Sequence, residues 1–147
     1  METYTEMKDR HQNEVNALPF AFAFSQKQYR AKLAEWGIAE EDARSGAIVG
    51  IGGGGFCRAE DHNKILETFR RIKAERNAAI ETDRTGDGFI YEMFLDELNN
   101  HEFSYTQDPG ETLRALDLTA DDINSNEALQ NGLKKAVQEI NAAHMTK

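Results

Sequence analysis

Four consecutive glycines, Gly52 to Gly55, stand between two short apolar runs in the stretch AIVGIGGGGFCRA. Glycine adopts the positive φ angles of tight hairpin turns without a steric penalty, so a glycine block between apolar runs favours a reversal of the chain. The stretch therefore predicts a β-hairpin with strands over Ala47–Ile51 and Phe56–Ala59. A chain with this hairpin must build at least part of its core on an antiparallel sheet.

The same glycines could instead hold an anion through their bare backbone N–H groups, which makes Gly53, Gly54 and Gly55 a weak candidate anion site. Arg58 is the charge closest to this turn in the sequence. No Lys-Ser or Lys-Thr pair follows the last glycine, as a phosphate-binding loop requires, and the next residues resemble a strand where a dinucleotide fold needs a helix. We expect a hairpin turn here and keep the anion site as the weaker alternative.

A third strand is predicted in LPFAFAF, where Phe20, Phe22 and Phe24 alternate with alanines. This period of two is typical of a strand, and the small alanine side would let protein cover both faces. Aromatic side chains in such a row can also stack on nucleic-acid bases, but stacking platforms lie in basic surroundings. Only Lys27 and Arg30 are close in the sequence, so we expect the three rings to pack in the core.

Helical periodicity and capping signals predict six or seven helices. Thr3 and Glu6 have the spacing of a capping box, Ser25 is placed as an N-cap, and Gly37 as a C-terminal stop. The predicted helices cover about 3–16, 26–36, 61–81, 89–100 and 109–116, with a last helix from about Glu127. Strands and helices do not alternate regularly, which predicts an α+β fold: a small three-stranded antiparallel sheet with the helices packed around it. The 147 residues fit a single domain, 1–147.

The stretch DRTGDGFIYEMF begins like a calcium-binding EF-hand loop, with Asp83 and Asp87 at the first and fifth places. The twelfth place, where a bidentate glutamate completes the calcium shell, holds Phe94. Losing two of the roughly six to eight oxygen ligands that calcium needs argues against a metal site. The sequence instead predicts a tight link between two helices, in which Asp87 helps to cap the helix that begins at Phe89.

The richest group of polar, site-capable residues lies at the end of that helix, in ELNNHEFSYT. Glu97 and His101 are four residues apart and so share a helix face, but one histidine and one glutamate make a weak metal site. A histidine at a helix C-terminus more often has a structural role, its ring bonded to the backbone. The candidate ligand or partner site comprises Arg58, Asn100, His101, Glu102 and Tyr105, and we predict no catalytic residue, no metal and no cofactor.

Charge and composition limit the classes of partner. The 26 acidic and 17 basic residues give a formal net charge of −9, which disfavours nucleic acid as a partner because phosphate binding needs Lys and Arg. No apolar run approaches the roughly 20 residues that span a bilayer, and the first residues have no apolar signal core. With Cys57 as the single cysteine, the sequence is typical of a reducing, cytoplasmic setting.

Three stretches, RHQNEVNALPFAFAFSQKQY, GIGGGGFCR and TGDGFIYEMFLDELNNHEFSYT, together with TLRALDL, resemble an uncharacterised family of small acidic proteins. Members of this family are encoded by bacteria, especially gut bacteria, and by their phages and mobile elements. The resemblance carries no activity and no catalytic residue. It implies a single-domain accessory protein of bacterial or phage origin, and many such proteins inhibit or modulate another protein.

These observations predict a non-enzymatic cytoplasmic interaction or regulatory protein that acts on a macromolecular, protein partner. The alternative is a small ligand-binding protein or enzyme whose pocket lies between the Gly52–Arg58 hairpin and the Asn99–Tyr105 segment. The sequence leaves the oligomeric state open.

Overall fold

The computed structural model describes residues 1–145, and the chain divides into two compact units. Unit 1 consists of Met1–His11 and Ala74–Lys147, and unit 2 consists of Gln12–Lys73. Helices α1 (Tyr4–Asn16) and α4 (His62–Thr82) each contribute residues to both units. The predicted single domain remains a prediction.

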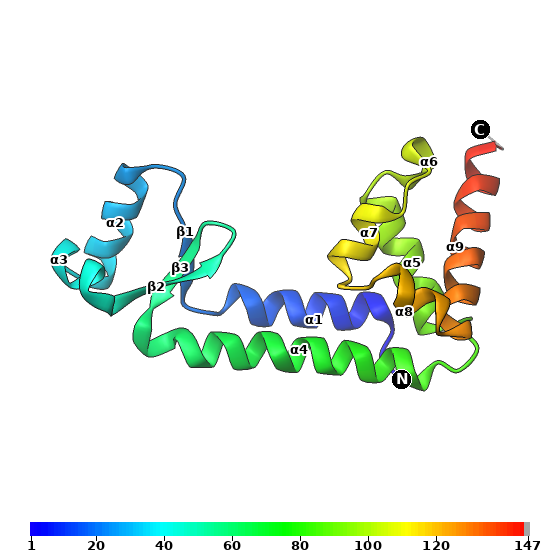
Figure 1. Ribbon diagram of the computed structural model, residues 1–147, viewed down its shortest axis with the longest axis horizontal. Coiled ribbons are helices and arrows are strands. Elements are labelled where there is room, and N and C mark those ends of the chain that lie inside the picture. The colour runs from blue at the N-terminus through cyan, green and yellow to red at the C-terminus, as the bar shows by residue number, and fades with distance from the viewer. Residues whose placement is uncertain (146–147) are drawn as a thin grey trace. The chain divides into compact units, whose positions relative to one another are not determined.

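Unit 2 contains the sheet, whose strand order is β1-β3-β2 with both pairs antiparallel (Figure 1). Between α1 and α4, the chain forms in order β1 (Phe20–Phe22), α2 (Gln26–Trp36), α3 (Glu40–Asp42), the π-helical turn η1 (Ala43–Ala47), β2 (Ile48–Gly52), β3 (Gly55–Arg58) and the 3-10 turn η2 (Ala59–Asp61). The hairpin is therefore confirmed, and positive φ angles of 94°, 59° and 82° at Gly52, Gly53 and Gly54 show why glycine occupies its turn.

One side of the sheet is covered by α2. Phe56 of β3 makes edge-to-face contacts with Tyr29 and Trp36, at ring-centroid distances of 5.1 Å and 5.6 Å. Both rings come from α2, which begins at the predicted Ser25 cap and ends at the predicted Gly37, whose φ of 70° is left-handed. Local capping chemistry thus fixes the length of the helix that closes this side of the sheet.

The aromatic strand departs from its predicted role. β1 pairs with β3, Phe20 opposite Cys57 and Phe22 opposite Gly55, so the strand exists where it was expected. However, Phe22 is 51% exposed and Phe24 is 87% exposed, so the prediction that all three rings pack in the core is wrong. The alternation correctly predicted a strand, but it carries no information about which side another element will cover.

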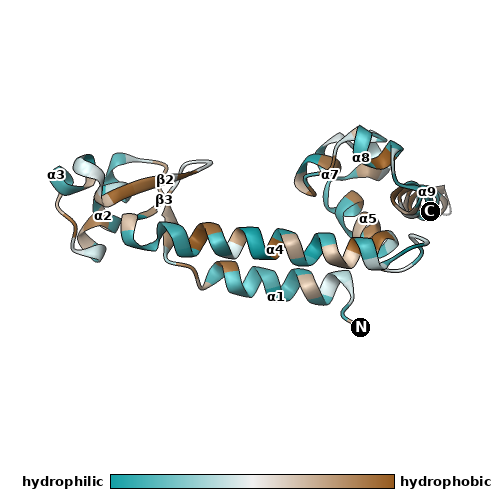
Figure 2. Ribbon diagram, turned by 60° about the horizontal axis from the view of Figure 1, so that its bottom comes forward, coloured by the Kyte–Doolittle hydropathy of each residue, from teal (hydrophilic) through white to brown (hydrophobic). Residues whose placement is uncertain are grey.

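Unit 1 is helical and has its own core. After α4 the chain forms α5 (Phe89–Asn100), α6 (Phe103–Thr106), α7 (Gly110–Ala115), α8 (Ala120–Asn124) and α9 (Glu127–Met145). Figures 1 and 2 show α5 and α9 side by side, and their apolar faces meet in a core that includes the fully buried Ile90, Phe94 and Ala136. None of the helices within residues 1–145 has the length and apolar character that crossing a bilayer requires.

The α+β class and the three-stranded antiparallel sheet are confirmed. Residues 1–145 contain nine α-helices, more than the predicted six or seven, because three segments expected as connectors form short helices. One of them is α8, where Thr119 and Asp122 make a capping box between the predicted helix that ends near Leu116 and the one that begins near Glu127. The other two are α3 and α6.

Helices α5 and α9 approach each other closely at Gly132. A Cβ atom added there would lie 2.4 Å from Ile90 Cγ2 and 2.8 Å from the carbonyl oxygen of Gly86. The glycine is therefore required by packing, although it weakens the helix that carries it.

We expect Gly132→Ala to destabilise unit 1 by about 1–2 kcal/mol, because the steric cost of overpacking exceeds the gain of about 1 kcal/mol in helix propensity. Urea unfolding followed by far-UV circular dichroism measures the change. The direction of the change in the unfolding midpoint separates the two effects. Helix propensity alone would raise the midpoint, so a raised midpoint would show that α5 and α9 can separate without cost.

Candidate functional site

The candidate site in unit 1 begins where α5 ends. His101 is the C-cap of α5, and its Nδ1 donates a hydrogen bond to the carbonyl oxygen of Glu97 at 2.8 Å. The same carbonyl accepts from Thr112 Oγ1 at 3.2 Å, which ties α5 to α7. The ring of His101 thus satisfies the end of its own helix, which is the structural role that the sequence analysis weighed against a functional one.

The carboxylate of Glu97 is buried and accepts hydrogen bonds from side chains of α1. Its Oε1 accepts hydrogen bonds from Tyr4 Oη at 2.9 Å and from Lys8 Nζ, and Lys8 also pairs with Asp96 at 2.9 Å. Burial, together with the charge of Glu97, raises the pKa of the Tyr4 phenol. Burial alone would lower the pKa of Lys8, but its bonds to Glu97 and Asp96 outweigh this and raise it. Both α1 side chains therefore keep their protons at neutral pH, and the network fixes α1 to α5.

Helix α6 is held between two residues with left-handed backbone. Glu102 precedes it with φ 55° and Gln107 follows it with φ 54°, conformations that cost a non-glycine residue roughly 1–2 kcal/mol each. The buried Phe103 anchors the helix, and Gln107 Nε2 donates to Asn141 Oδ1 on α9 at 2.9 Å. This arrangement presents Tyr105 outward, with 80% of its surface exposed. Strained backbone that supports an exposed aromatic side chain is a feature of binding sites.

Tyr105 borders a groove of about 370 Å³ between α5, α6 and α9. The buried Ile140 and half-buried Leu95 form its apolar part, and the rings of Tyr105 and His144 meet edge to face with centroids 6.0 Å apart. Its polar lining comes from Asn99, Ser104 and Glu139. An apolar groove bordered by an exposed tyrosine and a carboxylate suits an amphipathic, positively charged group.

Of the other predicted site residues, Asn100 is exposed and donates to Asp96 Oδ2 at 3.5 Å, and Glu102 is exposed as the N-cap of α6. Arg58 belongs to unit 2, where its Nε pairs with Asp61 at 2.9 Å and its guanidinium lies 5.7 Å from the centre of the Trp36 ring. The alternative pocket that would join Arg58 to the Asn99–Tyr105 segment remains a prediction.

Gly53 and Gly54 lie in the exposed hairpin turn, and Gly55 is buried at the start of β3. A Cβ atom at Gly55 would meet Ile51 Cγ1 at 2.9 Å and Phe22 Cε1 at 3.0 Å, so this glycine makes room for the Phe22 ring. The hairpin explains why all three positions are glycine. The weaker alternative, an anion site at these glycines, stays a prediction.

The calcium-like stretch uses its first carboxylate to hold its own backbone. Asp83 Oδ1 accepts from the N–H of Gly86 at 3.1 Å, while Oδ2 accepts from Gly88 at 3.1 Å and Ile90 at 3.0 Å. The prediction that Asp87 caps the Phe89 helix is wrong: Asp83 does so, and Asp87 Oδ1 instead accepts from Asn131 and Lys135 of α9, each at 2.8 Å. Asp83 can reach past the glycines because Gly86 turns the chain back toward it. Across residues 1–145, no three His, Cys, Asp or Glu side chains are placed to hold a metal ion.

Comparison with protein-family models identifies a family for this chain. The model of a family of unknown function, DUF7659, matches residues 3–139. The chain belongs to the DUF7659 family. No curated protein and no solved structure matches the chain.

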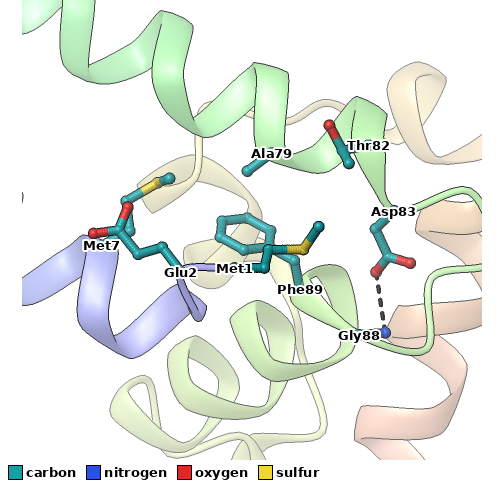
Figure 3. A pocket seen from close by; sticks show the side chains of 8 residues that line it. All are labelled: Met1, Glu2, Met7, Ala79, Thr82, Asp83, Gly88 and Phe89. Carbon is teal, nitrogen blue, oxygen red and sulfur yellow. Dashed lines mark hydrogen bonds between the residues drawn. The ribbon is translucent and has the colours of Figure 1, made fainter.

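The DUF7659 match includes the glycine hairpin, the Asp83 turn and the whole of α6, together with most of α9. Tyr105 lies inside the matched residues and His144 lies beyond them. A second hollow of about 320 Å³ extends to Met1 and Glu2, which also lie outside the match. Figure 3 shows Phe89 at the centre of this hollow, with Met7 of α1 and Ala79 of α4 beside it and the Asp83 turn at its edge.

The charge of this DUF7659 member divides unevenly between the units. Unit 2 carries eight Asp and Glu against nine Lys and Arg, a formal charge of +1, whereas unit 1 carries 18 against eight, a formal charge of −10. Between residues 102 and 127 a single basic residue, Arg114, accompanies seven exposed carboxylates: Glu102, Asp108, Glu111, Asp117, Asp121, Asp122 and Glu127. The sequence analysis treated the −9 as one number and missed this division, which counting the charges in successive segments would have found.

Proposed function

We propose that this protein is a non-enzymatic interaction protein whose unit 1 binds a protein partner through a basic surface on that partner. The observation that carries the proposal is the run of seven exposed carboxylates from Glu102 to Glu127, beside the exposed Tyr105. A concentration of one sign of charge attracts an oppositely charged surface and speeds its association. A tyrosine at the edge of an apolar groove supplies the local contact that slows dissociation.

The same proposal includes the setting. A cytoplasmic protein of bacterial, phage or mobile-element origin that inhibits or modulates its partner fits a small acidic chain without a cofactor motif. Binding by charge needs no chemistry in the chain itself, which agrees with a site in which Glu97, Lys8 and His101 are already occupied by one another and by the backbone.

The test compares two variants with equal changes of charge. In the first, Glu102, Glu111 and Glu127 become Gln and Asp121 becomes Asn; in the matched control, Glu35, Glu41 and Glu67 of unit 2 become Gln and Asp42 becomes Asn. All eight side chains are exposed. We expect the first variant to bind the partner captured from nuclease-treated bacterial lysate about 10- to 100-fold more weakly, and the control to bind as wild type.

Affinity should also fall as salt is raised, because exposed charges are screened. The single substitution Tyr105→Ala should increase the dissociation rate of the partner complex by a larger factor than it decreases the association rate. The proposal fails if no stoichiometric partner is recovered while a nucleotide or metabolite raises the melting temperature, a result that would favour the small-ligand alternative. It also fails if the two charge variants behave alike.

A further inference from the structure

The side of the sheet opposite α2 has no assigned role, and it is covered only in part: Cys57 on this side is buried. The register places Phe20 beside Cys57 and Val49 on one side, with Phe22 beside Gly55 on the same side. Phe20 is partly covered by Phe69 of α4, at a centroid distance of 6.4 Å, and it meets Phe22 edge to face at 5.5 Å. Beyond Phe20 the covering ends, which leaves Phe22 exposed at the free edge of β1 and Phe24 exposed in the bend that follows the strand, where its N–H donates to Gln28 Oε1.

No charged residue lies at this edge in the sequence. The ten residues from Ala17 to Gln26 include no Asp, Glu, Lys or Arg, although 29% of the whole chain is charged. Proteins commonly protect an exposed edge strand with charged side chains, above all lysine, because like charges prevent two edges from pairing. Here only Pro19 and the short length of β1 limit pairing. An uncharged aromatic edge is energetically costly to leave in water and lacks the repulsion that would keep a second copy away.

The segment is also self-complementary. Phe20-Ala-Phe-Ala-Phe24 reads the same in both directions, with Phe22 at its centre. Two antiparallel copies related by a two-fold axis at Phe22 place phenylalanine opposite phenylalanine at every second position, and alanine opposite alanine between them. Few strands meet this condition, because an ordinary strand paired with itself opposes unlike or like-charged side chains.

We propose that residues 20–24 form a homodimer contact, in which the edge of β1, extended by two residues to Phe24, lies antiparallel to the same edge of a second copy. Phe22 then faces Phe22 of the partner subunit, and Phe20 faces Phe24 of the partner subunit. The contact uses the β1 edge of both copies, so the assembly closes at two chains and does not extend into a fibre.

The size of the contact sets its strength. A phenylalanine buries roughly 150–250 Å² at most, so the exposed parts of Phe22 and Phe24 contribute roughly 200–300 Å² per copy. Stable interfaces bury about 800 Å² per partner. The dimer is therefore weak and reversible, and it forms with rising protein concentration.

Sedimentation velocity of the full chain tests the proposal at concentrations from about 1 µM to about 1 mM. We expect the mass to rise from the 16.6 kDa of one chain toward twice that value. Phe24→Glu, at a side chain that contributes almost nothing to the monomer, should hold the mass at one chain, and Phe22→Glu should do the same. Tyr105→Glu, which changes an equally exposed aromatic residue of unit 1, should dimerise as wild type.

Hydrogen exchange at low and high concentration locates the contact, with slower exchange at high concentration confined to residues near 20–24. A wild-type mass that stays at one chain throughout would overturn the proposal, and so would a dimer that Phe24→Glu leaves intact. Neither result bears on the acidic partner surface of unit 1, whose test uses different residues.

Discussion

An alanine at position 86 is expected to lower the free energy of unfolding by about 3 kcal/mol. Gly86 has φ 84°, a conformation that penalises every L side chain. A Cβ atom there would also lie 2.0 Å from the carbonyl oxygen of Ala128 and 3.0 Å from the backbone nitrogen of Gly132. Because both neighbours are helix backbone, no side-chain rotation can relieve the clash, and α9 would have to move away from the turn.

Urea unfolding followed by far-UV circular dichroism measures this loss, with Gly50→Ala as the matched control. Gly50 has ordinary backbone, and the nearest atom to its added Cβ is 4.0 Å away, so the control should unfold as wild type. If Gly86→Ala and Gly50→Ala unfold at the same urea concentration, the close approach of the turn to α9 is wrong.

The same variant tests the predicted single domain. Trp36 is the only tryptophan in the sequence and belongs to unit 2, so its fluorescence reports on the unit that does not contain Gly86. One cooperative domain requires the Trp36 transition to shift together with the circular dichroism transition. A Trp36 transition that stays at the wild-type urea concentration would show that the units unfold independently.

Predictions from the sequence succeeded where a structural feature depends on neighbours in the chain. The Thr3–Glu6 capping box, the Ser25 cap of α2 and the bounds of α5 all depend on residues within four positions of each other. The glycine hairpin belongs to the same group, since its turn is decided by four consecutive residues. These features place the elements but do not say what each element packs against.

Prediction from the sequence failed in two situations. In one, a residue other than glycine adopts a left-handed backbone; in the other, the two residues in contact are far apart in the sequence. Left-handed φ angles were expected only at glycine, so the turns at Glu102 and Gln107 that frame α6 gave no signal in the sequence. The buried Glu97 is satisfied by Tyr4, which is 93 positions away, and nothing local identifies that partner. The candidate site could therefore be proposed from its composition and stays a prediction, while the exposure of Tyr105 and its groove required the structure.

The Asp83 turn combines both cases, and it leads to the second large expected effect. We expect Asp83→Ala to lower the free energy of unfolding by about 2–3 kcal/mol, because three backbone N–H groups lose their acceptor at once. Two of these groups, on Gly86 and Ile90, belong to partly buried parts of the turn, where water replaces the carboxylate poorly. Asp83→Asn should cost less, since its amide oxygen can still accept one or two of the bonds.

Asp87→Ala is the matched control, an equal truncation four residues along the same loop. Its carboxylate is exposed and binds Lys135 and Asn131, so its removal should change stability far less than the removal of Asp83. The hydrogen bond from Lys135 lowers the pKa of Asp87, so its contribution is present above the unfolded-state pKa and is lost as the pH falls. Urea unfolding at neutral pH separates the two roles. If both variants lose the same free energy of unfolding, or if Asp87→Ala loses more, Asp87 and not Asp83 caps α5. A larger loss for Asp83→Ala would show that a carboxylate in the first place of a calcium-like loop can be occupied entirely by the backbone of its own turn.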